Sequence, residues 1–590
     1  MRAFWLATAA VWAASPALAQ SGDPLAPLTT EPAPQEAPAP TVPVPAPAPT
    51  VQLPPPPPVL VIPRDWRGVF SAIRAGDWRA AEAGIATLPA DVLTPVAKAE
   101  LYTAKGSPAV DLPRLLALLA EAPELPQAEQ ISRLAIARGA ITLPPIYPRQ
   151  PVVMLGSAPG RTRARAVSGE PLADQLRAQI EPMLSDADDA PGAESLLISY
   201  APSLSYEARA EASQRIAWTY YRLGRDPDAR RLADSGRLGA VGEWAAHSAW
   251  VSGLASWRLS DCEAASRAFR EVVANTRERE LAAGAYYWMA RSEQACRRPR
   301  AVAPLMKAAA RSAESFYGLI ARATLGMDTH LPPDPHNYAA RVEGLPNVRR
   351  SVELVRLGER WLGEEMLRHQ ARIGRAEEHH GLIEFAKRLD LAGAQFWLAH
   401  NGQRGAVADP QDRYPAPRWT PLTGWRVDPA LAFAHIIQES TFRADAVSPV
   451  GATGLMQVSP GTEQDMARHR GLNYSRGTLT DPATNLEYGQ SFIELIRRSA
   501  YTGGQLPKVI AAYNAGPLPV GRWASIYDKG DPLLWIESIP YWETRYYVPA
   551  VLRNMWVYQG LNRTATPSLS ALAQHRWPTF PTGMTRLAEQ

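Results

Sequence analysis

A long helical stretch limits what this chain can fold into. From Asp65 to Asn401 the sequence is rich in Ala and Leu at helical spacing and has almost none of the alternating pattern that predicts strands. Short turn-and-helix phrases recur in it: AGDWRAAEAGI at 75–85, LGRDPDARRLA at 223–233 and LSDCEAASRAF at 259–269. The sequence therefore predicts a mostly α-helical fold.

The spacing of these phrases predicts how the helices are arranged. Asp226 and Asp261 lie 35 residues apart, and each is expected to cap a new helix. A period of about 34 residues is typical of tetratricopeptide-like hairpins, which cannot bury their apolar faces alone and stack into a superhelix. Large aromatic residues, such as Trp218, Trp250 and Trp288, are expected to pack between hairpins.

The N-terminus predicts export. Residues 1–19 begin with one Arg, continue with an apolar run and end in Ala-Leu-Ala, which indicates a signal peptide cleaved after Ala19. Gln20 follows the cleavage point, where a lipid-anchored protein would have Cys. Because no later window offers the ~20 uncharged apolar residues of a transmembrane helix, a periplasmic location is expected.

Composition divides the rest of the chain. Residues 20–63 are dominated by Pro and Ala and are expected to form an extended, disordered linker. The helical region is assigned to 64–405, and a Gly- and Pro-rich boundary separates it from a compact unit at 406–562. Residues 563–590 are interpreted as a C-terminal tail.

Charge and cysteine content narrow the possible functions. The net charge of +4 comes without a dense Lys/Arg block, which favours an ordinary solvated surface over a nucleic-acid interface. Two cysteines are too few for a disulfide scaffold or a zinc module. Cys262 and Cys296 fall at adjacent ends of one predicted hairpin, so a single disulfide is expected after export. His379-His380 is interpreted as an exposed helix surface instead of a metal site.

One glutamate of the second unit is placed unusually. Asp428-Pro429 predicts a helix start, and the helix is apolar on almost every side until Glu439 near its end. Burial and the negative end of the helix dipole both favour the neutral acid, which can protonate a leaving oxygen. The alternative is a glutamate that caps or pairs at its own helix end, for example with His435 one turn earlier.

Three downstream blocks supply polar and aromatic groups. GATGLMQ at 451–457 allows close backbone approach and carries an amide side chain. A helix with Pro507 at its start ends in AYNAG at 512–516, which presents Tyr and Asn. IESIPYWETRYYV at 536–548 is dense in aromatic side chains, whose flat faces suit sugar rings.

In order and spacing, these blocks resemble the soluble lytic transglycosylases of bacterial cell walls. The matching residues are ES-x-F-x-x-x-A-x-S from Glu439 to Ser448, GLMQ at 454–457, AYNAG at 512–516 and IP-x-x-ETR-x-YV at 539–548. Upstream, SFYGLIARATLG at 315–326 looks like a phrase of that family's helical ring. The resemblance implies an α-superhelical ring of helical hairpins with a C-terminal lysozyme-like domain, α+β but mainly helical.

The resemblance also implies roles for single residues. Glu439 would be the sole catalytic acid and base. Seven side chains would line the cleft and orient the glycan, namely Ser448, Met456 (by packing beneath), Gln457, Tyr513, Asn514, Glu543 and Tyr547. Ser459 departs from the family, in which methionine is more usual at this position.

The implied reaction cleaves peptidoglycan glycan strands without water. Glu439 would protonate the oxygen of the N-acetylmuramic acid–β-1,4–N-acetylglucosamine bond and then take the proton of the muramoyl 6-hydroxyl, closing a 1,6-anhydro ring. A hydrolytic glycosidase needs a second carboxylate. The nearest candidates, Asp445, Glu463 and Asp465, are interpreted as solvated charges.

Two alternatives stay open from the sequence. One is a hydrolytic muramidase on the same fold, and the other is a non-catalytic wall-binding adaptor built of helical repeats. No cofactor or metal is expected. Peptidoglycan strands are the expected partner, nucleic acid is not, and partners in the cell-wall machinery are not specified.

Overall fold

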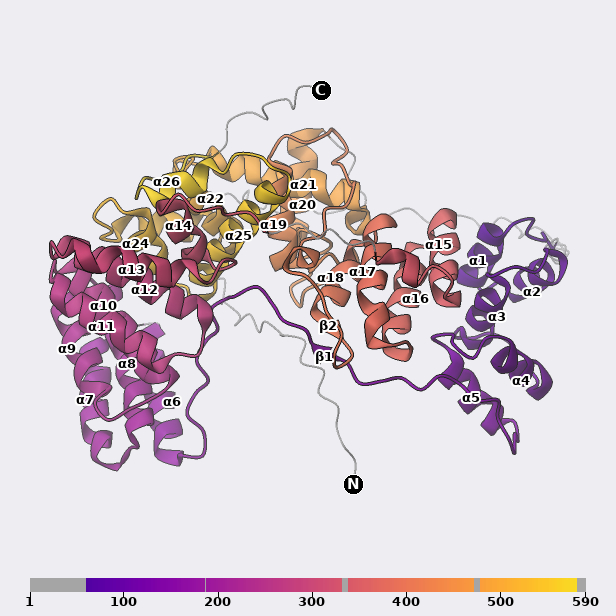
Figure 1. Cartoon of the computed structure of the whole chain (residues 1–590), viewed down its shortest axis with the longest axis horizontal. Coiled ribbons are helices and arrows are strands. Elements are labelled where there is room, and N and C mark those ends of the chain that lie inside the picture. The colour runs from indigo at the N-terminus through magenta and orange to yellow at the C-terminus, as the bar shows by residue number, and fades with distance from the viewer. Residues whose placement is uncertain (1–59, 186, 332–337, 472–477, 581–590) are drawn as a thin grey trace, which may run out of the picture. The chain divides into compact units, whose positions relative to one another are not determined.

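The described part of the chain is almost entirely helical. The computed structural model (Figure 1) describes residues 60–185, 187–331, 338–471 and 478–580, so the predicted signal peptide, most of the predicted linker and the end of the predicted tail lie outside it. Over these residues the chain forms 26 α-helices and one two-stranded sheet, and the prediction of a mostly α fold is confirmed. None of the described helices is long and apolar enough to cross a membrane.

The helices and strands of the described residues have the following bounds, in chain order. The first fourteen helices are α1 (Trp66–Ala75), α2 (Trp78–Thr87), α3 (Thr94–Thr103), α4 (Leu112–Glu121), α5 (Ala128–Ala137), α6 (Pro171–Ser185), α7 (Ala190–Tyr200), α8 (Tyr206–Arg222), α9 (Asp226–Gly236), α10 (Glu243–Arg258), α11 (Cys262–Asn275), α12 (Arg279–Ala295), α13 (Pro299–Ala310) and α14 (Phe316–Thr324). The others are α15 (Pro346–Leu357), α16 (Arg360–Ile373), α17 (His379–Arg388), α18 (Ala392–His400), α19 (Pro429–Glu439), α20 (Pro460–Arg470), α21 (Pro482–Arg497), α22 (Leu506–Ala515), α23 (Pro517–Arg522), α24 (Pro532–Glu537), α25 (Trp542–Leu561) and α26 (Pro567–Ala573). The two strands are β1 (Val153–Met154) and β2 (Asn401–Gly402), which pair antiparallel.

Helices α6 to α14 form a stack of helical hairpins. Each packs against the next in sequence, and α8 also contacts α10 while α12 contacts α14. Aromatic rings fill the spaces between them: Trp250 meets Phe269 edge-on at 5.3 Å between centroids, and Phe269 stacks on Trp288 at 6.0 Å. The predicted packing of aromatic residues between hairpins is confirmed for these rings. Trp218 instead stays partly exposed, with the Arg545 guanidinium 3.7 Å from its ring centroid.

Only one of the two aspartates predicted to cap helices does so. Asp261 caps α11, because its carboxylate accepts a hydrogen bond from the Ala264 N–H at 3.0 Å. Asp226 is instead the first residue of α9, and its buried carboxylate lies 2.6 Å from Nη2 of Arg258 on α10. That ion pair, which the sequence did not predict, joins two consecutive helices.

The interpretation of His379-His380 as an exposed surface is wrong. The two side chains on α17 are only 2% and 7% exposed, since α16 and α18 both pack against this helix. His380 stacks on Tyr338 with 4.1 Å between ring centroids, and its Nε2 lies 3.2 Å from Asp412 Oδ2. The Lys387 ammonium lies 2.6 Å from Asp412 Oδ1. The lysine therefore balances the charge of this carboxylate, in the place that a metal cation would take.

The first helices share a core with helices far along the chain. Buried residues of α1 to α5 form one hydrophobic cluster with Leu354 of α15 and with Leu362 and Met366 of α16. A second cluster holds α15 to α18 together, and the largest runs from α6 through α14 into α19 to α26. The stack of hairpins and the C-terminal helices therefore share one continuous core.

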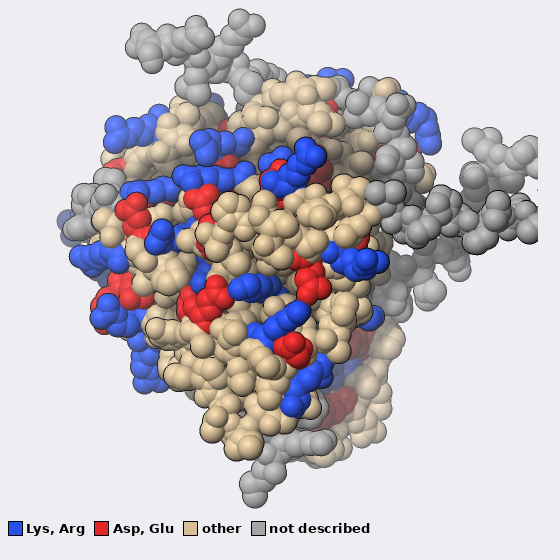
Figure 2. Space-filling view, turned by 90° about the vertical axis from the view of Figure 1, so that its right-hand side faces the viewer, with Lys and Arg blue, Asp and Glu red and all other residues tan. Residues whose placement is uncertain are grey.

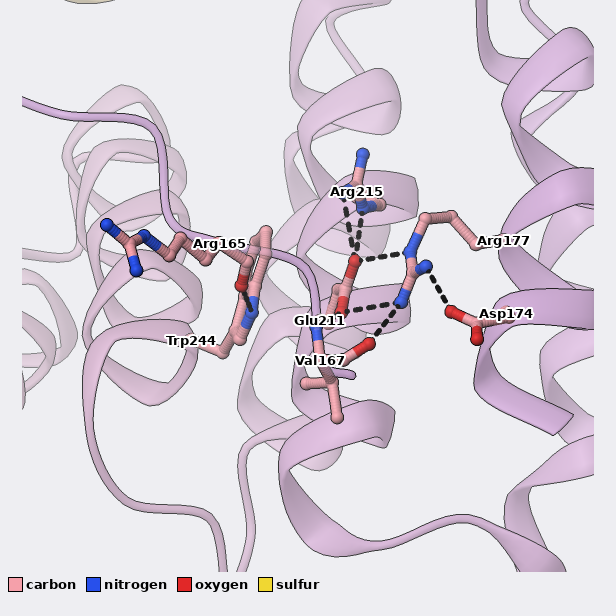
Figure 3. A network of polar contacts seen from close by, with 7 residues as sticks. All are labelled: Arg165, Val167, Asp174, Arg177, Glu211, Arg215 and Trp244. Carbon is pink, nitrogen blue, oxygen red and sulfur yellow. Dashed lines mark hydrogen bonds and ion pairs between the residues drawn. The ribbon is translucent and has the colours of Figure 1, made fainter. Parts of the chain in front are cut away.

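An extended segment, residues 141–170, joins α5 to α6 and ties distant helices together. Figure 3 shows its end: the Glu211 carboxylate accepts hydrogen bonds from the Val167 N–H at 2.7 Å and from Arg177 Nε at 2.8 Å, and the Trp244 indole N–H donates to a carbonyl of the segment at 2.8 Å. Nearer its middle, Arg161 contacts both carboxylate oxygens of Glu537 at 2.6 and 3.0 Å. The segment thus links α8 and α10 to α24.

The described part of the predicted tail is packed. Helix α26 contacts α14, and its Leu569 and Leu572 are buried. Beyond it, the Phe580 N–H donates to the Gly504 carbonyl at 2.7 Å, and the Trp577 ring lies 5.6 Å from Trp535. Residues up to 580 are therefore part of the folded unit.

Charges on the surface are mixed. On the face shown in Figure 2, Lys and Arg alternate with Asp and Glu and are separated by broad areas of other residues. Many of these charges form ion pairs within or between helices, such as Arg231 with Glu194 at 2.8 Å. Exposed pairs of this kind contribute little to stability.

The predicted disulfide is confirmed. Cys262 begins α11, Cys296 follows the last residue of α12, and their Cα atoms lie 5.6 Å apart in the Cys262–Cys296 bridge. The bridge closes the open end of one hairpin.

Reducing this disulfide should lower the free energy of unfolding. In the chain-entropy model, a crosslink across 34 residues stabilises the fold by about 3 to 4 kcal/mol. Denaturant titrations with and without reductant measure the difference, and a Cys262→Ser/Cys296→Ser variant, which should not respond to reductant, is the control. Two labelled thiols in the denatured, unreduced exported protein would contradict the assignment.

Candidate active site

Glu439 is the last residue of α19, a helix that is largely buried. Asp428 caps the helix by accepting a hydrogen bond from the Ala430 N–H at 2.9 Å, and Pro429 follows it, as predicted. All residues from Ala430 to Ile436 are buried, and α25 packs along the helix. The Gln559 amide near the end of α25 donates to Asp428 at 2.8 Å, which makes the two helices antiparallel.

The backbone turns sharply after Glu439. Thr441 and Phe442 have φ of +52° and +64°, a left-handed backbone conformation that residues other than glycine seldom adopt. Phe442 is held there by burial, with its ring 6.3 Å from that of Phe433 on α19. Strained backbone of this kind is typical of functional sites.

The Glu439 carboxylate meets a tyrosine from α25. The Tyr547 hydroxyl donates to Glu439 Oε1 at 2.5 Å and lies 2.7 Å from Nδ1 of His435, which is one turn before Glu439 on α19. The alternative in which Glu439 pairs with His435 is therefore not what the structure has, because Tyr547 lies between them. Three side chains from two helices form a single hydrogen-bonded chain.

Glu439 is partly exposed but poorly solvated. Burial raises the pKa of Glu439 to about 7, the hydrogen bond from Tyr547 opposes this rise, and the negative charge of Glu543 adds to it. His435 has the opposite response, since burial lowers its pKa to about 3 and keeps it neutral. A carboxyl group with a pKa near neutrality can both donate and accept a proton at physiological pH.

The glycine-containing loop after α19 is organised by its own side chains. Ser448 Oγ accepts from the Ala452 N–H at 3.0 Å, and the Gln457 amide donates to the carbonyls of Ala446 and Gly454 at 3.1 and 2.9 Å. These two predicted substrate-binding residues thus lie on one loop and shape it. The Gln457 side chain is partly exposed, and its backbone is left-handed with a φ of +48°.

Met456 is buried beneath the loop, as its expected packing role requires. Its Sδ faces Gly489 of α21 so closely that a Cβ at that glycine would lie 2.2 Å from the sulfur. Only a residue without a side chain leaves room here. The Tyr513 hydroxyl of α22 donates to the Met456 carbonyl at 2.8 Å and fixes the loop from the other side.

The remaining predicted residues lie where α22 meets α25. Asn514 Oδ1 accepts from the Thr544 hydroxyl at 2.6 Å, and the Tyr513 ring lies 4.4 Å from the His435 ring. Glu543 is partly exposed in the first turn of α25, where the helix dipole stabilises its negative charge. Glu439, Tyr513, Asn514, Glu543 and Tyr547 are thus brought together from three helices.

Among the three carboxylates interpreted as solvated charges, one is buried. Asp445 and Asp465 are exposed, and Asp465 pairs with Arg468 at 3.4 Å. Glu463 is only 4% exposed, because it lies on the inward side of the first turn of α20. Its interpretation as a solvated charge is wrong.

Asn485 is a residue that the sequence did not single out. It is fully buried on α21, accepts from the Met456 N–H at 2.8 Å and donates to the carbonyls of Thr453 and Leu479, both at 2.9 Å. One amide thus holds the loop at two points, Thr453 and Met456, and also bonds to the turn before its own helix. Its place on the apolar face of a helix, four residues before Gly489, is the signal that could have revealed it.

Ser459 has a structural role. Its hydroxyl caps α20 by accepting from the Thr462 N–H at 3.2 Å. The departure from the family pattern thus coincides with a helix N-cap, a position that serine favours.

Comparisons with known proteins agree with this fold. Residues 421–536 match the family described as Transglycosylase SLT domain. The soluble lytic murein transglycosylase of Escherichia coli strain K12 is 30% identical over 253 residues, which are 40% of this chain and 38% of the relative. That of Salmonella typhimurium is 36% identical over 132 residues, 22% of this chain and 20% of the relative. The chain thus matches about two fifths or less of the length of these relatives.

Solved structures extend the similarity to most of the chain. The crystal structure of the 70 kDa soluble lytic transglycosylase from Escherichia coli has a TM-score of 0.53 at 20% identity, covering 87% of this chain and 74% of that one. The structure of an inactive mutant of lytic transglycosylase Slt from Pseudomonas aeruginosa has a TM-score of 0.52 at 19% identity, covering 87% and 88%. The fold is therefore an α-superhelix of hairpins with a C-terminal lysozyme-like domain, as predicted. Over the matched residues, the comparisons thus agree with the resemblance to the soluble lytic transglycosylases that the sequence indicated.

Gly489→Ala should destabilise the loop that carries the candidate site. The new methyl group would meet the Met456 sulfur, and overpacking of a filled core costs about 1 to 3 kcal/mol. Thermal unfolding measures the loss. Gly461→Ala is the matched control, because that helical glycine has nothing within 4 Å of the added Cβ. Equal melting temperatures for the two variants would contradict the packing argument.

Proposed function

We propose that this protein is a lytic transglycosylase that cleaves the N-acetylmuramic acid–β-1,4–N-acetylglucosamine bond of peptidoglycan without water. The observation that carries the proposal is Glu439, a carboxyl group with a pKa raised to about 7, at the end of a buried helix within the stretch similar to the SLT domain. The names of the similar proteins, soluble lytic murein transglycosylases, support the substrate class.

In the proposed reaction, Glu439 first acts as the acid. It donates its proton to the glycosidic oxygen as the bond to the muramic acid C1 breaks, and N-acetylglucosamine leaves with a free 4-hydroxyl group. The acetamido group of the substrate can stabilise the positive charge that develops on C1. The Tyr547 hydroxyl then stabilises the Glu439 carboxylate through the 2.5 Å hydrogen bond.

Glu439 next acts as the base. The carboxylate takes the proton of the muramoyl 6-hydroxyl, whose oxygen bonds to C1 and closes the 1,6-anhydro ring. The carboxyl group returns to its starting state, so one glutamate serves both steps. A pKa near neutrality suits this double role, because neither protonation state is strongly disfavoured.

The other predicted site residues are proposed to hold the glycan. Asn514, Gln457 and Glu543 keep partly exposed polar side chains, and Tyr513 fixes the loop through the carbonyl of the buried Met456. Ser448 is proposed to hold the shape of the loop and to contact the glycan with its hydroxyl group. Positioning groups of this kind contribute to catalysis by orienting the reacting atoms.

We also propose the rest of the predicted organisation. The superhelical region is assigned to 64–405 and the catalytic domain to 406–562, and glycan strands of peptidoglycan are the proposed partner. The periplasm is the proposed location, in line with the signal peptide predicted for residues 1–19. The packed helix α26 supports including residues up to 580 in the folded enzyme.

A hydrolytic muramidase is the second candidate, and one observation favours it. Glu543 acts electrostatically on Glu439 and is therefore a second carboxylate near the site, as a hydrolytic mechanism requires. The mass of the products separates the candidates, since anhydro ends are lighter by one water than reducing ends. A non-catalytic adaptor would not require a buried carboxyl group with a raised pKa, such as that of Glu439.

Glu439→Gln should abolish the release of anhydromuropeptides from purified sacculi. Glutamine keeps the size of the side chain but cannot donate the catalytic proton, and loss of a general acid costs about a hundredfold or more in rate. Asp445→Asn, which makes the same chemical change at an exposed loop carboxylate, should keep wild-type activity. Residual activity of Glu439→Gln within about tenfold of wild type would refute the assignment.

Glu543→Gln should move the pH profile to lower pH. The wild-type kcat/KM should fall above about pH 7, because the first step needs protonated Glu439. The Glu543 charge raises the pKa of Glu439, so removing that charge lowers the pKa and shifts the alkaline limb downward. Initial rates between pH 5 and 9 measure the shift, and an unmoved limb would contradict the electrostatic role of Glu543.

A further inference from the structure

His435 is a buried histidine with a single polar contact. Its side chain is 1% exposed on α19, and Nδ1 lies 2.7 Å from the Tyr547 hydroxyl oxygen. Among the residues that the structure describes, Nε2 is buried and has no hydrogen-bond partner. Burial lowers the pKa of His435 to about 3, so the ring is neutral and carries one proton at neutral pH.

The position of that proton follows from Tyr547. An ionised carboxylate can only accept hydrogen bonds, so the one hydroxyl hydrogen of Tyr547 points to Glu439 Oε1, 2.5 Å away. The tyrosine oxygen is then left to accept, and the group that faces it is His435 Nδ1. Nδ1 must therefore carry the proton of the imidazole.

The unpaired Nε2 agrees with this assignment. With the proton on Nδ1, Nε2 is a bare acceptor in an apolar place, and an unsatisfied buried acceptor is tolerated better than an orphaned N–H donor. The other tautomer would bury an N–H group without a partner. It would also leave two acceptors, Nδ1 and the tyrosine oxygen, facing each other with no hydrogen between them. The geometry thus selects one tautomer.

We propose that His435 is a positioning residue, which holds the Tyr547 hydroxyl as a donor to Glu439 Oε1 and so keeps the catalytic proton on Glu439 Oε2. This deepens, and rests on, the proposed function of the same site. Oε1 is occupied by a donor that cannot reverse, so the proton of the acid form goes to the other oxygen. Among the described residues, Oε2 makes no hydrogen bond, and the Glu439 side chain is partly exposed.

The groups around the hydrogen-bonded side chains of His435, Tyr547 and Glu439 are compatible with the proposal. From α25, Glu543 repels the ionised form of Glu439. Burial, together with the charges of Glu439 and Glu543, keeps the pKa of Tyr547 well above its usual value. From α22, the Tyr513 ring packs at a tilt against His435, but its hydroxyl donates to the Met456 carbonyl. Tyr547 therefore stays protonated, and Tyr513 does not compete for it.

His435→Phe tests the proposal by removing Nδ1 while keeping a ring against Tyr513. Without the donor, the bond from Tyr547 to ionised Glu439 weakens, because hydrogen bonds in a chain strengthen one another. The alkaline limb of kcat/KM should move up by about half to one pH unit, and kcat should fall about tenfold with little change in KM. This direction is opposite to that expected for Glu543→Gln.

His435→Asn is the matched conservative variant. Its side-chain amide can place an N–H close to where Nδ1 stood, so it should recover most of the rate and the wild-type position of the limb. A double-mutant cycle adds a second check: in a Tyr547→Phe background, His435→Phe should not move the limb further. A rate loss in His435→Phe without any shift of the limb would mean a purely structural role and overturn the proposal.

One measurement does not depend on activity and needs only one folded variant, to identify the signals. In wild-type protein labelled with ¹⁵N-histidine, the His435 signals, identified by their loss in His435→Asn or His435→Phe, should show a protonated Nδ1 and a bare Nε2 at neutral pH. A protonated Nε2 would overturn the proposal even if the folded variant were inactive. Failure of wild type to release anhydromuropeptides would instead refute the proposed function, and the tautomer would still be read.

Discussion

The antiparallel packing of α19 against α25 is the contact on which the rest of the C-terminal domain depends. It buries nearly the whole of α19 and brings the last residue of one helix beside the first turns of the other, which places Glu439 against Tyr547. At the opposite end, Gln559 bonds to Asp428, the cap of α19. Burial thus stabilises the domain and, by removing water from one carboxyl group, raises the pKa of Glu439.

Helix α25 also connects the domain to the hairpin stack. Its Arg545 lies over Trp218 of α8, and Arg161 of the extended segment forms a buried ion pair with Glu537 just before it. Tyr317 of α14 donates to the same carboxylate at 2.7 Å. Removing one partner of such a pair leaves a buried charge and costs far more than an exposed pair contributes. The superhelix therefore supports the helix that carries two of the candidate site residues, Glu543 and Tyr547.

The site balances opposing effects on one group. Burial and Glu543 favour the protonated form of Glu439, whereas Tyr547 favours the ionised form. A residue that must give a proton and take another needs such a compromise. His435 enters this balance indirectly, because a neutral ring without a second partner fixes the direction of the hydrogen bond from Tyr547.

The sequence by itself determined the elements whose causes are local. The Asp428-Pro429 start of α19, the hairpins and the blocks that resemble the SLT domain could be predicted, because caps, helical periodicity and motifs lie within a few residues of one another. The bridge between Cys262 and Cys296 could be predicted because it joins the ends of one hairpin. Tertiary structure decided which side chains are buried and which partners they meet. Asp226 pairs with Arg258 instead of capping, His379-His380 is covered by neighbouring helices, and Asn485 reaches a loop about 30 residues away. The hydrogen bonds from Tyr547 to Glu439 and to His435 join residues more than a hundred positions apart, and only the packing of two helices brings these side chains together.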